Sequence, residues 1–419
     1  MKRRIATLPL HGGKAPAWLF KRMARLSAAV TMAVVDEHGP LEMLRRLSDP
    51  WWFQAFGCAL GFDWHSSGLT TVTCGALKEA RRIVGDDLGI HVAGGKGKTS
   101  RKTPQEIEET ADRKGIPSGD RLIHASRMSA KVDSAAVQDG YDIYHHSFFF
   151  TDDGAWCVVQ QGMSEENKYA RRYHWLGETV HDFVCEPHHG IDGEAIEDRR
   201  SREGQAHGEA PGAGEQLLLL NLVAEESGDN RSRCAELIRW NPDHLLAELE
   251  RFTEGPTLFA PAHHPVLPTD VNLPRLRKIV RVAHENHPSD FATLLGTPGV
   301  GAATIRSLAL LAELIYDSPA SRRDPARTVP GTVLASPGGR ERSERSVPGT
   351  VLAGRRWADY SYAHGGKDGF PYPVDRETYD RNIEVLMGAI RQARVGETDK
   401  IDALKRLGGL AGETRGGLP

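Results

Sequence analysis

Polar side chains that could bind a metal ion or transfer a proton gather in the first 189 residues, beside aromatic residues. The candidates are carboxylates, imidazoles and one amide: Asp63, His65, Asp133, His145, His146, Gln160 and His174. Imidazole and carboxylate groups are the usual general bases and the usual ligands of hydrolytic metals. Asp63 and His65 are two residues apart, which would place them on the same side of a strand. Together with His145 they are predicted to hold a divalent metal, Mg²⁺ or Mn²⁺.

The alternative for each single histidine is a surface or hydrogen-bonded structural role, and it stays open. Gln160 lies where nucleases of the restriction-enzyme type often place an acidic residue followed by x-Lys. This chain has Gln160-Gln161-Gly162 there instead, with no lysine. The nuclease fold is therefore not assigned from this segment. Buried polar groups need partners, so some pairing among these side chains is expected.

A second kind of chemistry, binding of phosphate groups, is indicated by residues 290–316. Thr297-Pro298-Gly299-Val300-Gly301 separates two apolar helical stripes, and this pattern resembles the helix-hairpin-helix motif. Two glycines permit backbone angles that other residues avoid, and they let main-chain N–H groups approach an anion. Those N–H groups would lie at the N-terminus of the second helix, where the dipole favours phosphate. The alternative is a tight helix-helix turn without a ligand.

The residues expected to contact nucleic-acid phosphates surround this turn and two basic segments. They are Gly299, Val300, Gly301, Thr304, Arg306, Arg275, Lys278, Arg281, Lys96 and Lys98. Ala302 and Ala303 stand where many such motifs carry a lysine, so the basic run 275–281 is expected to supply the positive charge. Residues 94–102 are Gly- and Lys-rich but lack the glycine spacing of a P-loop.

The sequence patterns of the segments that must position these groups predict an α+β fold that is mainly helical. Apolar residues at helical spacing indicate helices over 16–37, 41–47 and 76–88, with another beginning at Thr103 as its N-cap. Aromatic and β-branched residues flanking Asp152-Asp153-Gly154-Ala155 predict a β-hairpin, 147–151 with 156–160. Residues 217–224 read as a strand, and 230–240, 242–252 and 273–284 as helices.

Compositional breaks divide the chain. The predicted units are a mixed α/β domain 1–189 with the candidate active site, a polar linker 190–215, a helical domain 216–317, a linker 318–355, a helical cap 356–407 and a tail 408–419. The second linker contains the sequence VPGTVLA twice, at 329–335 and 347–353. Two copies of seven residues are too short to build a repeat fold.

Composition narrows the classes of protein. The 419 residues carry a net charge of −3, so a polyanion site must be a local patch. Five cysteines without a Cys-x-x-Cys pair support neither a disulfide scaffold nor a thiolate zinc site. Apolar runs fall far below the roughly 20 residues that span a bilayer. No secretion signal follows Met1, and the expected location is the cytoplasm.

Several long segments resemble a prokaryotic family known as domain of unknown function 763. They are KRRIATLPLHGGKAPAWLF, LSDPWWFQAFGCALGFDWHSSGLTTVTCGALKEA, YHHSFFF, VVQQGM, ARRYHWL and AHGGKDGFPYPVD. The resemblance covers most of residues 1–317 and 360–407, and the repeat-bearing segment departs from it. It implies no mechanism, and a DNA-related role follows from it by analogy only.

The leading hypothesis is a DNA-binding protein that acts as a metal-dependent, structure-specific nuclease or repair factor. The first alternative is a non-catalytic DNA-binding adaptor, which is favoured if the His, Asp and Gln candidates do not converge on one site. The second alternative is an enzyme acting on a small phosphorylated molecule, with residues 94–102 as its phosphate loop.

Overall fold

The structure is a computed structural model that describes residues 3–10, 15–62, 66–166, 168–185, 188–190, 219–253 and 273–323. Three sequence predictions lie outside these residues: the sites at Asp63 and His65, the VPGTVLA repeat, and the C-terminal cap and tail. Nearly all of the predicted linker 190–215 also lies outside them.

A mixed sheet of six strands forms the centre of the described fold, with the order β2-β4-β5-β6-β1-β7. Its neighbouring strands are antiparallel, except that β1 and β7 are parallel. The bounds are β1 (Arg3–Pro9), β2 (His91–Lys96), β4 (Asp142–Phe150), β5 (Trp156–Met163), β6 (Tyr169–Leu176) and β7 (His188–Gly190). A two-stranded sheet pairs β3 (Val137–Gln138) with β8 (Leu220–Asn221).

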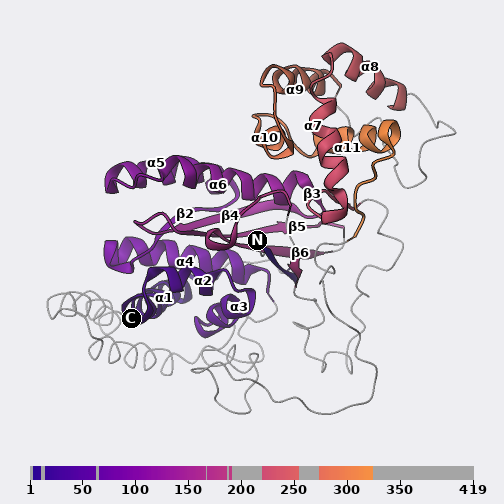
Figure 1. The fold of residues 1–419 in the computed structure, drawn as a ribbon. Helices are drawn as coiled ribbons and strands as arrows, with labels where there is room; N and C mark the ends of the chain where they lie inside the picture. The colour runs from indigo at the N-terminus through magenta and orange to yellow at the C-terminus, as the bar shows by residue number, and fades with distance from the viewer. Residues whose placement is uncertain are drawn as a thin grey trace, which may run out of the picture.

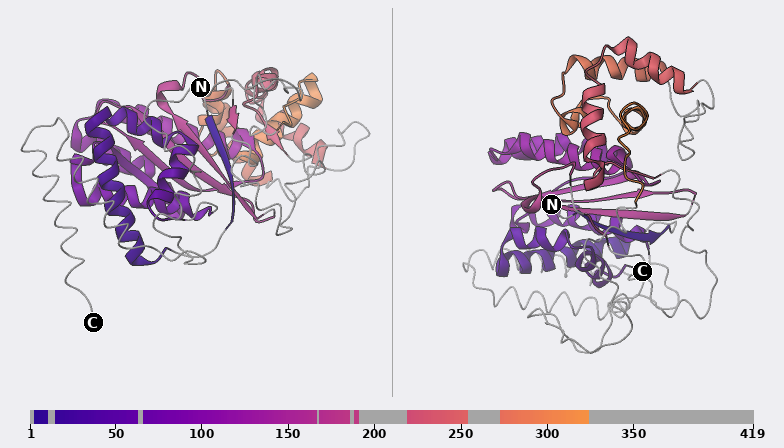
Figure 2. Two further views of the ribbon diagram at one scale, coloured as in Figure 1. Left: turned by 90° about the horizontal axis from the view of Figure 1, so that it is seen from below. Right: turned by 45° about the vertical axis from the view of Figure 1, so that its right-hand side comes forward.

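Helices cover both faces of the six-stranded sheet (Figure 1). One face carries α1 (Ala17–His38), α2 (Pro40–Leu47), α3 (Pro50–Ala59) and α4 (Gly68–Val84). The other carries α5 (Thr103–Lys114) and α6 (Gly119–Lys131). Beyond α6 lie α7 (Gly228–Leu237), α8 (Pro242–Thr253), α9 (Leu273–Glu285), α10 (Phe291–Gly296) and α11 (Ala302–Tyr316). Figure 2 shows these later helices on the α6 side of the sheet.

The hairpin β4–β5 contributes side chains to the apolar cores on both faces of the sheet. Phe148 and Phe150 pack against the α6 side, and Phe149 between them packs against the α4 side. Because both faces are covered, a strand here is apolar without alternation. The predicted hairpin is confirmed, with Asp152-Asp153-Gly154-Ala155 in its turn, and the mainly helical α+β class is confirmed with it.

The apolar core on the α6 side extends into the later helices. It begins at Ala93 on β2 and reaches Ala320 after α11, so residues from both predicted blocks share it. The division into domains stays a prediction. In the part of the chain that the structure describes, none of the helices is both long enough and apolar enough to cross a membrane.

Two local predictions are wrong. Thr103 is the first residue of α5 rather than its N-cap, with helical φ −52° and ψ −47°, and its hydroxyl donates to the carbonyl of Ser100 at 2.7 Å. Within the described part of the strand expected over 217–224, which begins at residue 219, the strand is Leu220–Asn221, and Leu222 N–H donates to the carbonyl of Ala136 after it. A short apolar run does not by itself fix a strand's length.

Candidate functional site

The turn between α10 and α11 contains the glycines predicted to bind phosphate. Val300 N–H donates to the Thr297 carbonyl at 3.2 Å, which closes the turn. Gly299 has φ +88°, a conformation that side-chain-bearing residues rarely adopt. Gly301 has φ −145° and ψ −169°, which is extended backbone open to any residue. The prediction that both glycines are needed for their backbone angles is therefore wrong for Gly301.

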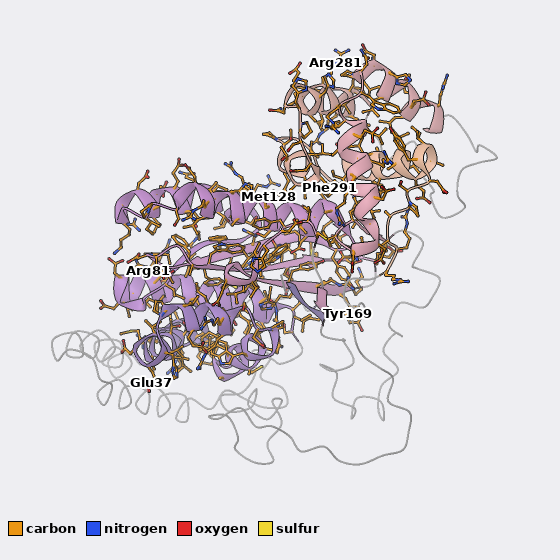
Figure 3. All side chains as sticks on the ribbon, viewed as in Figure 1. Glu37, Arg81, Met128, Tyr169, Arg281 and Phe291 are labelled. Atoms are coloured by element: carbon orange, nitrogen blue, oxygen red, sulfur yellow. The ribbon has the colours of Figure 1, made fainter. Side chains whose placement is uncertain are left out.

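Lys131, the last residue of α6, supports this turn from behind. Its ammonium group donates to the carbonyls of Thr297 at 2.8 Å and Val300 at 2.7 Å. Partial burial lowers the pKa of Lys131 to about 8. Met128, one turn earlier on α6, and Phe291 of α10 belong to the same core (Figure 3), and a Cβ built at Gly296 would lie 3.6 Å from Met128 Sδ. The turn is thus attached to the sheet domain through α6, and two of its carbonyl oxygens are occupied.

The first turn of α11 presents backbone N–H groups. Gly301 is the N-cap, and its carbonyl already accepts from Ile305 N–H at 3.0 Å. The N–H groups of Ala302, Ala303 and Thr304 have no acceptor within the helix, as in any first helical turn. Gly301 has no side chain that could cap them, and a Cβ built on it would meet no atom within 4 Å. These N–H groups can therefore bind an anion.

Two residues of the predicted phosphate set have other roles. The side chain of Thr304 is buried, so its backbone N–H is the group that could contact phosphate. Val300 is also buried and belongs to the α6-side core, where it fixes the turn to the protein. Thr304 faces inward because it lies on the same face of α11 as Leu308, which belongs to that core.

The positive charge of α9 is partly compensated by α8. Arg277 forms an ion pair with Glu250 at 2.9 Å, and Arg281 forms one with Asp243 at 2.9 Å. Both pairs are exposed, and such pairs contribute little to stability. Lys278 on the same helix is exposed and has no ion pair among the described residues. Within the predicted basic run, Lys278 is therefore more available to an external anion than Arg281.

Further cations lie close to the turn. Arg306 on α11 is exposed, and its Nε donates to Gln138 Oε1 at 2.7 Å. Gln138 in turn donates to the carbonyl of Ala302 at 3.0 Å, which links β3 to the start of α11. Arg127 is exposed on α6, four residues before Lys131 and therefore on the same helix face.

The basic segment after β2 lies at the end of the sheet that is nearest to the turn 297–301. It forms a 3₁₀ helix over Gly97–Lys102, and Lys96, Lys98, Arg101 and Lys102 are all exposed. Helix α5 begins there, and the short connection to α6 brings α6 back antiparallel, so that Lys131 ends at the same edge. The two predicted basic sites are therefore at one end of the molecule.

The residues proposed for catalysis divide between the two faces of the sheet. His146, Gln160 and Asp133 meet on the α6 side: His146 Nδ1 lies 2.7 Å from Gln160 Oε1, and Gln160 Nε2 donates to Asp133 Oδ2 at 2.5 Å. Trp175 Nε1 donates to the same Asp133 oxygen at 2.7 Å, and Ser126 Oγ lies 2.9 Å from His146 Nε2. All three predicted residues are buried.

His145 and His174 lie on the α4 side instead. Nδ1 of His174 lies 2.9 Å from the carbonyl of Leu47, and Arg172 Nε donates to His174 Nε2 at 2.8 Å. Nε2 of His145 lies 3.1 Å from Ser147 Oγ. Burial lowers the pKa of His145 to about 3 and that of His146 to about 4, so both imidazoles are neutral at pH 7.

The predicted single site is therefore not formed by these residues. His145 and His146 are neighbours on a strand, and successive strand side chains point to opposite faces. Among the described residues there is no group of three or more His, Cys, Asp or Glu that could hold a metal ion. Asp63 and His65, the other two predicted ligands, lie outside those residues.

Sequence reasoning missed three buried or supporting polar residues. Gln161 and Arg172 stand beside predicted residues, and the alternation of β5 and β6 would have placed them with His145. Lys131 carried no sequence signal, because its two acceptors lie more than 160 positions away along the chain.

The fold and site define a class: a largely antiparallel sheet between two helical layers, with a helical block that presents a glycine turn at one end. Residues 4–374 match the model of the family described as protein of unknown function (DUF763), and the chain belongs to that family. No curated protein and no solved structure matches the chain.

Proposed function

We propose that this protein binds nucleic acid, with DNA as the expected partner, through the sugar-phosphate backbone at the turn 297–301. The observation that carries the proposal is the start of α11, where uncapped N–H groups follow a turn whose carbonyl groups accept hydrogen bonds from Lys131. Helix N-termini of this kind are natural phosphate sites. Backbone N–H groups contact no base edge, so the binding has no sequence preference from this source.

Exposed cations at the same end of the sheet support the proposal. Arg127, Lys278 and Arg306 lie on the three helices that surround or form the turn. Lys98 and its neighbours on the 3₁₀ helix add a second cluster at the same edge. If four of these cations each neutralise one phosphate, the slope of log K against log salt is about −3.6 on duplex DNA. A small ligand with one phosphate neutralised by one cation would give a slope of roughly −1.

Non-catalytic binding is the form of this function that the site supports best. Candidate catalytic side chains lie on both faces of the sheet, and Asp133, Gln160 and His146 are buried and hydrogen-bonded to one another. Metal-dependent cleavage is the alternative, and it is tested directly. Branched, nicked and single-stranded DNA are incubated with the full chain and Mg²⁺ or Mn²⁺. Cutting that co-purifies with the protein and is lost in Asp133→Asn would replace the adaptor function with the nuclease.

The binding proposal is tested by Gly301→Ser. The extended conformation of Gly301 is the usual N-cap conformation, and a serine oxygen there accepts a hydrogen bond from an N–H of the first helical turn. The variant therefore occupies the groups that would bind phosphate, while stability stays constant or rises by about a few tenths of a kcal/mol. We expect DNA affinity, measured by fluorescence anisotropy, to fall about threefold to tenfold.

Gly301→Ala is the matched control. Its methyl group enters open space and offers no oxygen, so the N–H groups stay available. Most of the affinity should remain. If Gly301→Ser binds DNA as tightly as the unaltered protein, the turn is not the phosphate site.

A further inference from the structure

The basic segment 94–102 begins at Gly94 on β2, and two charged side chains hold this glycine. The Gly94 N–H donates to Glu106 Oε2 at 2.7 Å, and Lys78 Nζ donates to the Gly94 carbonyl at 2.8 Å. Lys78 and Glu106 also form an ion pair with each other at 2.6 Å. Both main-chain groups of one residue are therefore bound by one ion pair.

This ion pair joins the two helical layers across the edge of the sheet. Lys78 lies on α4 and Glu106 on α5, and these helices cover opposite faces of the sheet at β2 (Figure 1). Strand β2 is the end of the described sheet, so the pair occupies main-chain groups that a further strand would otherwise bind. The two side chains are 25% and 28% exposed, and hydrogen bonds to charged groups are among the strong ones.

The segment is also fixed by close packing and by its own hydrogen bonds. Gly94 has φ +85°, and a Cβ there would overlap with the carbonyl oxygen of His146 and the hydroxyl of Thr103. Thr103 Oγ1 donates to the Ser100 carbonyl at 2.7 Å, and Ser100 Oγ donates to the Gly97 carbonyl at 2.6 Å. The segment between β2 and α5 is therefore held at its start and folded back on itself.

The cations of this segment are available to an external anion. Exposed side chains without an ion pair in the part of the chain that the structure describes are Lys96, Lys98, Arg101 and Lys102. On α9, by contrast, Arg277 and Arg281 are paired with acidic residues of α8. Several cations on one segment contact phosphates together only if the backbone that carries them is held in place, because ordering a loose segment on binding costs free energy.

We propose that Lys78 and Glu106 are positioning residues of the nucleic-acid site: they hold the segment 94–102 so that its cations meet the sugar-phosphate backbone together. The proposal rests on the nucleic-acid binding proposed above, and it makes this segment a second contact surface besides the turn 297–301. Lys78 and Glu106 act through Gly94 and need not contact phosphate themselves.

The test is Glu106→Ala in the full chain. Removal of a carboxylate close to the cations would by charge alone strengthen DNA binding, whereas loss of the hold on Gly94 should weaken it. We expect the affinity, measured by fluorescence anisotropy, to fall about tenfold. If two of four phosphate contacts are lost, the slope of log K against log salt falls in magnitude from about −3.6 to about −1.8. A change in overall stability alone would not alter this slope.

Two further variants separate the hold on Gly94 from a change of charge. Glu108→Ala is the matched control, because Glu108 is exposed on the same helix and the variant loses the same charge. Its affinity should stay constant or rise slightly. Glu106→Gln keeps an oxygen that can accept from the Gly94 N–H and should retain most of the affinity.

Hydrogen exchange measured without DNA follows the segment itself. Exchange in residues 94–102 should become faster in Glu106→Ala and stay unchanged in Glu108→Ala. If the unaltered protein binds DNA, and Glu106→Ala binds it equally tightly with the same salt slope, the positioning role is overturned and the nucleic-acid function stands. Unchanged exchange in Glu106→Ala would also overturn the positioning role. Absence of DNA binding by the unaltered protein would remove both.

Discussion

The two glycines of the turn 297–301 should respond differently to substitution by alanine. Gly299 has φ +88°, and a side chain at such an angle costs roughly 1–2 kcal/mol. A Cβ added at Gly299 would lie 3.5 Å from Ile279 Cγ1, an ordinary contact, so strain is the whole penalty. The lower entropy of alanine in the unfolded chain offsets up to about 0.4–1 kcal/mol. We expect Gly299→Ala to lower the free energy of unfolding by about 1 kcal/mol.

Gly301→Ala should change that free energy by less than about 0.5 kcal/mol. The residue has an extended backbone and open space around it, so alanine meets neither strain nor a clash. Alanine lowers the entropy of the unfolded chain, which stabilises the fold, but it is a weaker N-cap than glycine, which destabilises it. The two effects oppose each other.

The assay is urea denaturation of the full chain and both variants, followed by far-UV circular dichroism. Since α10 and α11 share their core with the sheet, their loss should be visible in the main transition. The midpoint should fall for Gly299→Ala without a change in slope, and stay constant for Gly301→Ala. Equal losses in the two variants, or a larger loss at Gly301, would refute this account of the turn.

Three further predictions concern buried polar groups. Lys131→Met removes two hydrogen bonds to the turn and should lower the free energy of unfolding, measured by denaturation, by about 2–4 kcal/mol. Hydrogen exchange at the Val300 N–H should become faster, and protection equal to that of the unaltered chain would contradict the role of Lys131 in holding the turn. The pKa values of His145 and His146 are depressed in the fold, so below about pH 6.5 the unfolded chain binds more protons than the folded one. The free energy of unfolding should therefore fall as the pH drops from about 6.5 toward 4, by up to about 1.4 kcal/mol per pH unit for each histidine. His146→Gln should make this dependence on pH less steep. Arg172→Lys keeps the charge but loses the planar donor set, and thermal unfolding should show a loss of about 2–4 kcal/mol; an unchanged midpoint would mean that the hydrogen bonds of the buried guanidinium group do not stabilise the fold.

Much of the local structure followed from the sequence. The Asp-Asp-Gly turn between two apolar strands predicted the hairpin β4–β5, because turn chemistry and β propensity act over a few residues. Helices α1, α2 and α11 followed from apolar spacing in the same way. Strands β1 and β2 were not predicted, since their pairing with β6 and β4 joins segments far apart in the chain.

The candidate site could be predicted only in part. The sequence located the glycine turn of α11 and the cations near it, but it treated Gly299 and Gly301 alike. It also grouped His145 with His146, although strand alternation already placed them on opposite faces. The network of Asp133, Gln160 and Trp175 needed the packing of α6 on the sheet, which no spacing reveals.

The sequence by itself determined which segments become helix, hairpin and turn, because those preferences depend on neighbouring residues. Only the tertiary structure decided which face each polar side chain occupies and which distant groups it meets. Lys131 supports a turn that follows it by more than 160 residues, and Arg172 finds its acceptors on α3 and α4. Such contacts arise because a buried donor must find an acceptor wherever the fold brings one within reach.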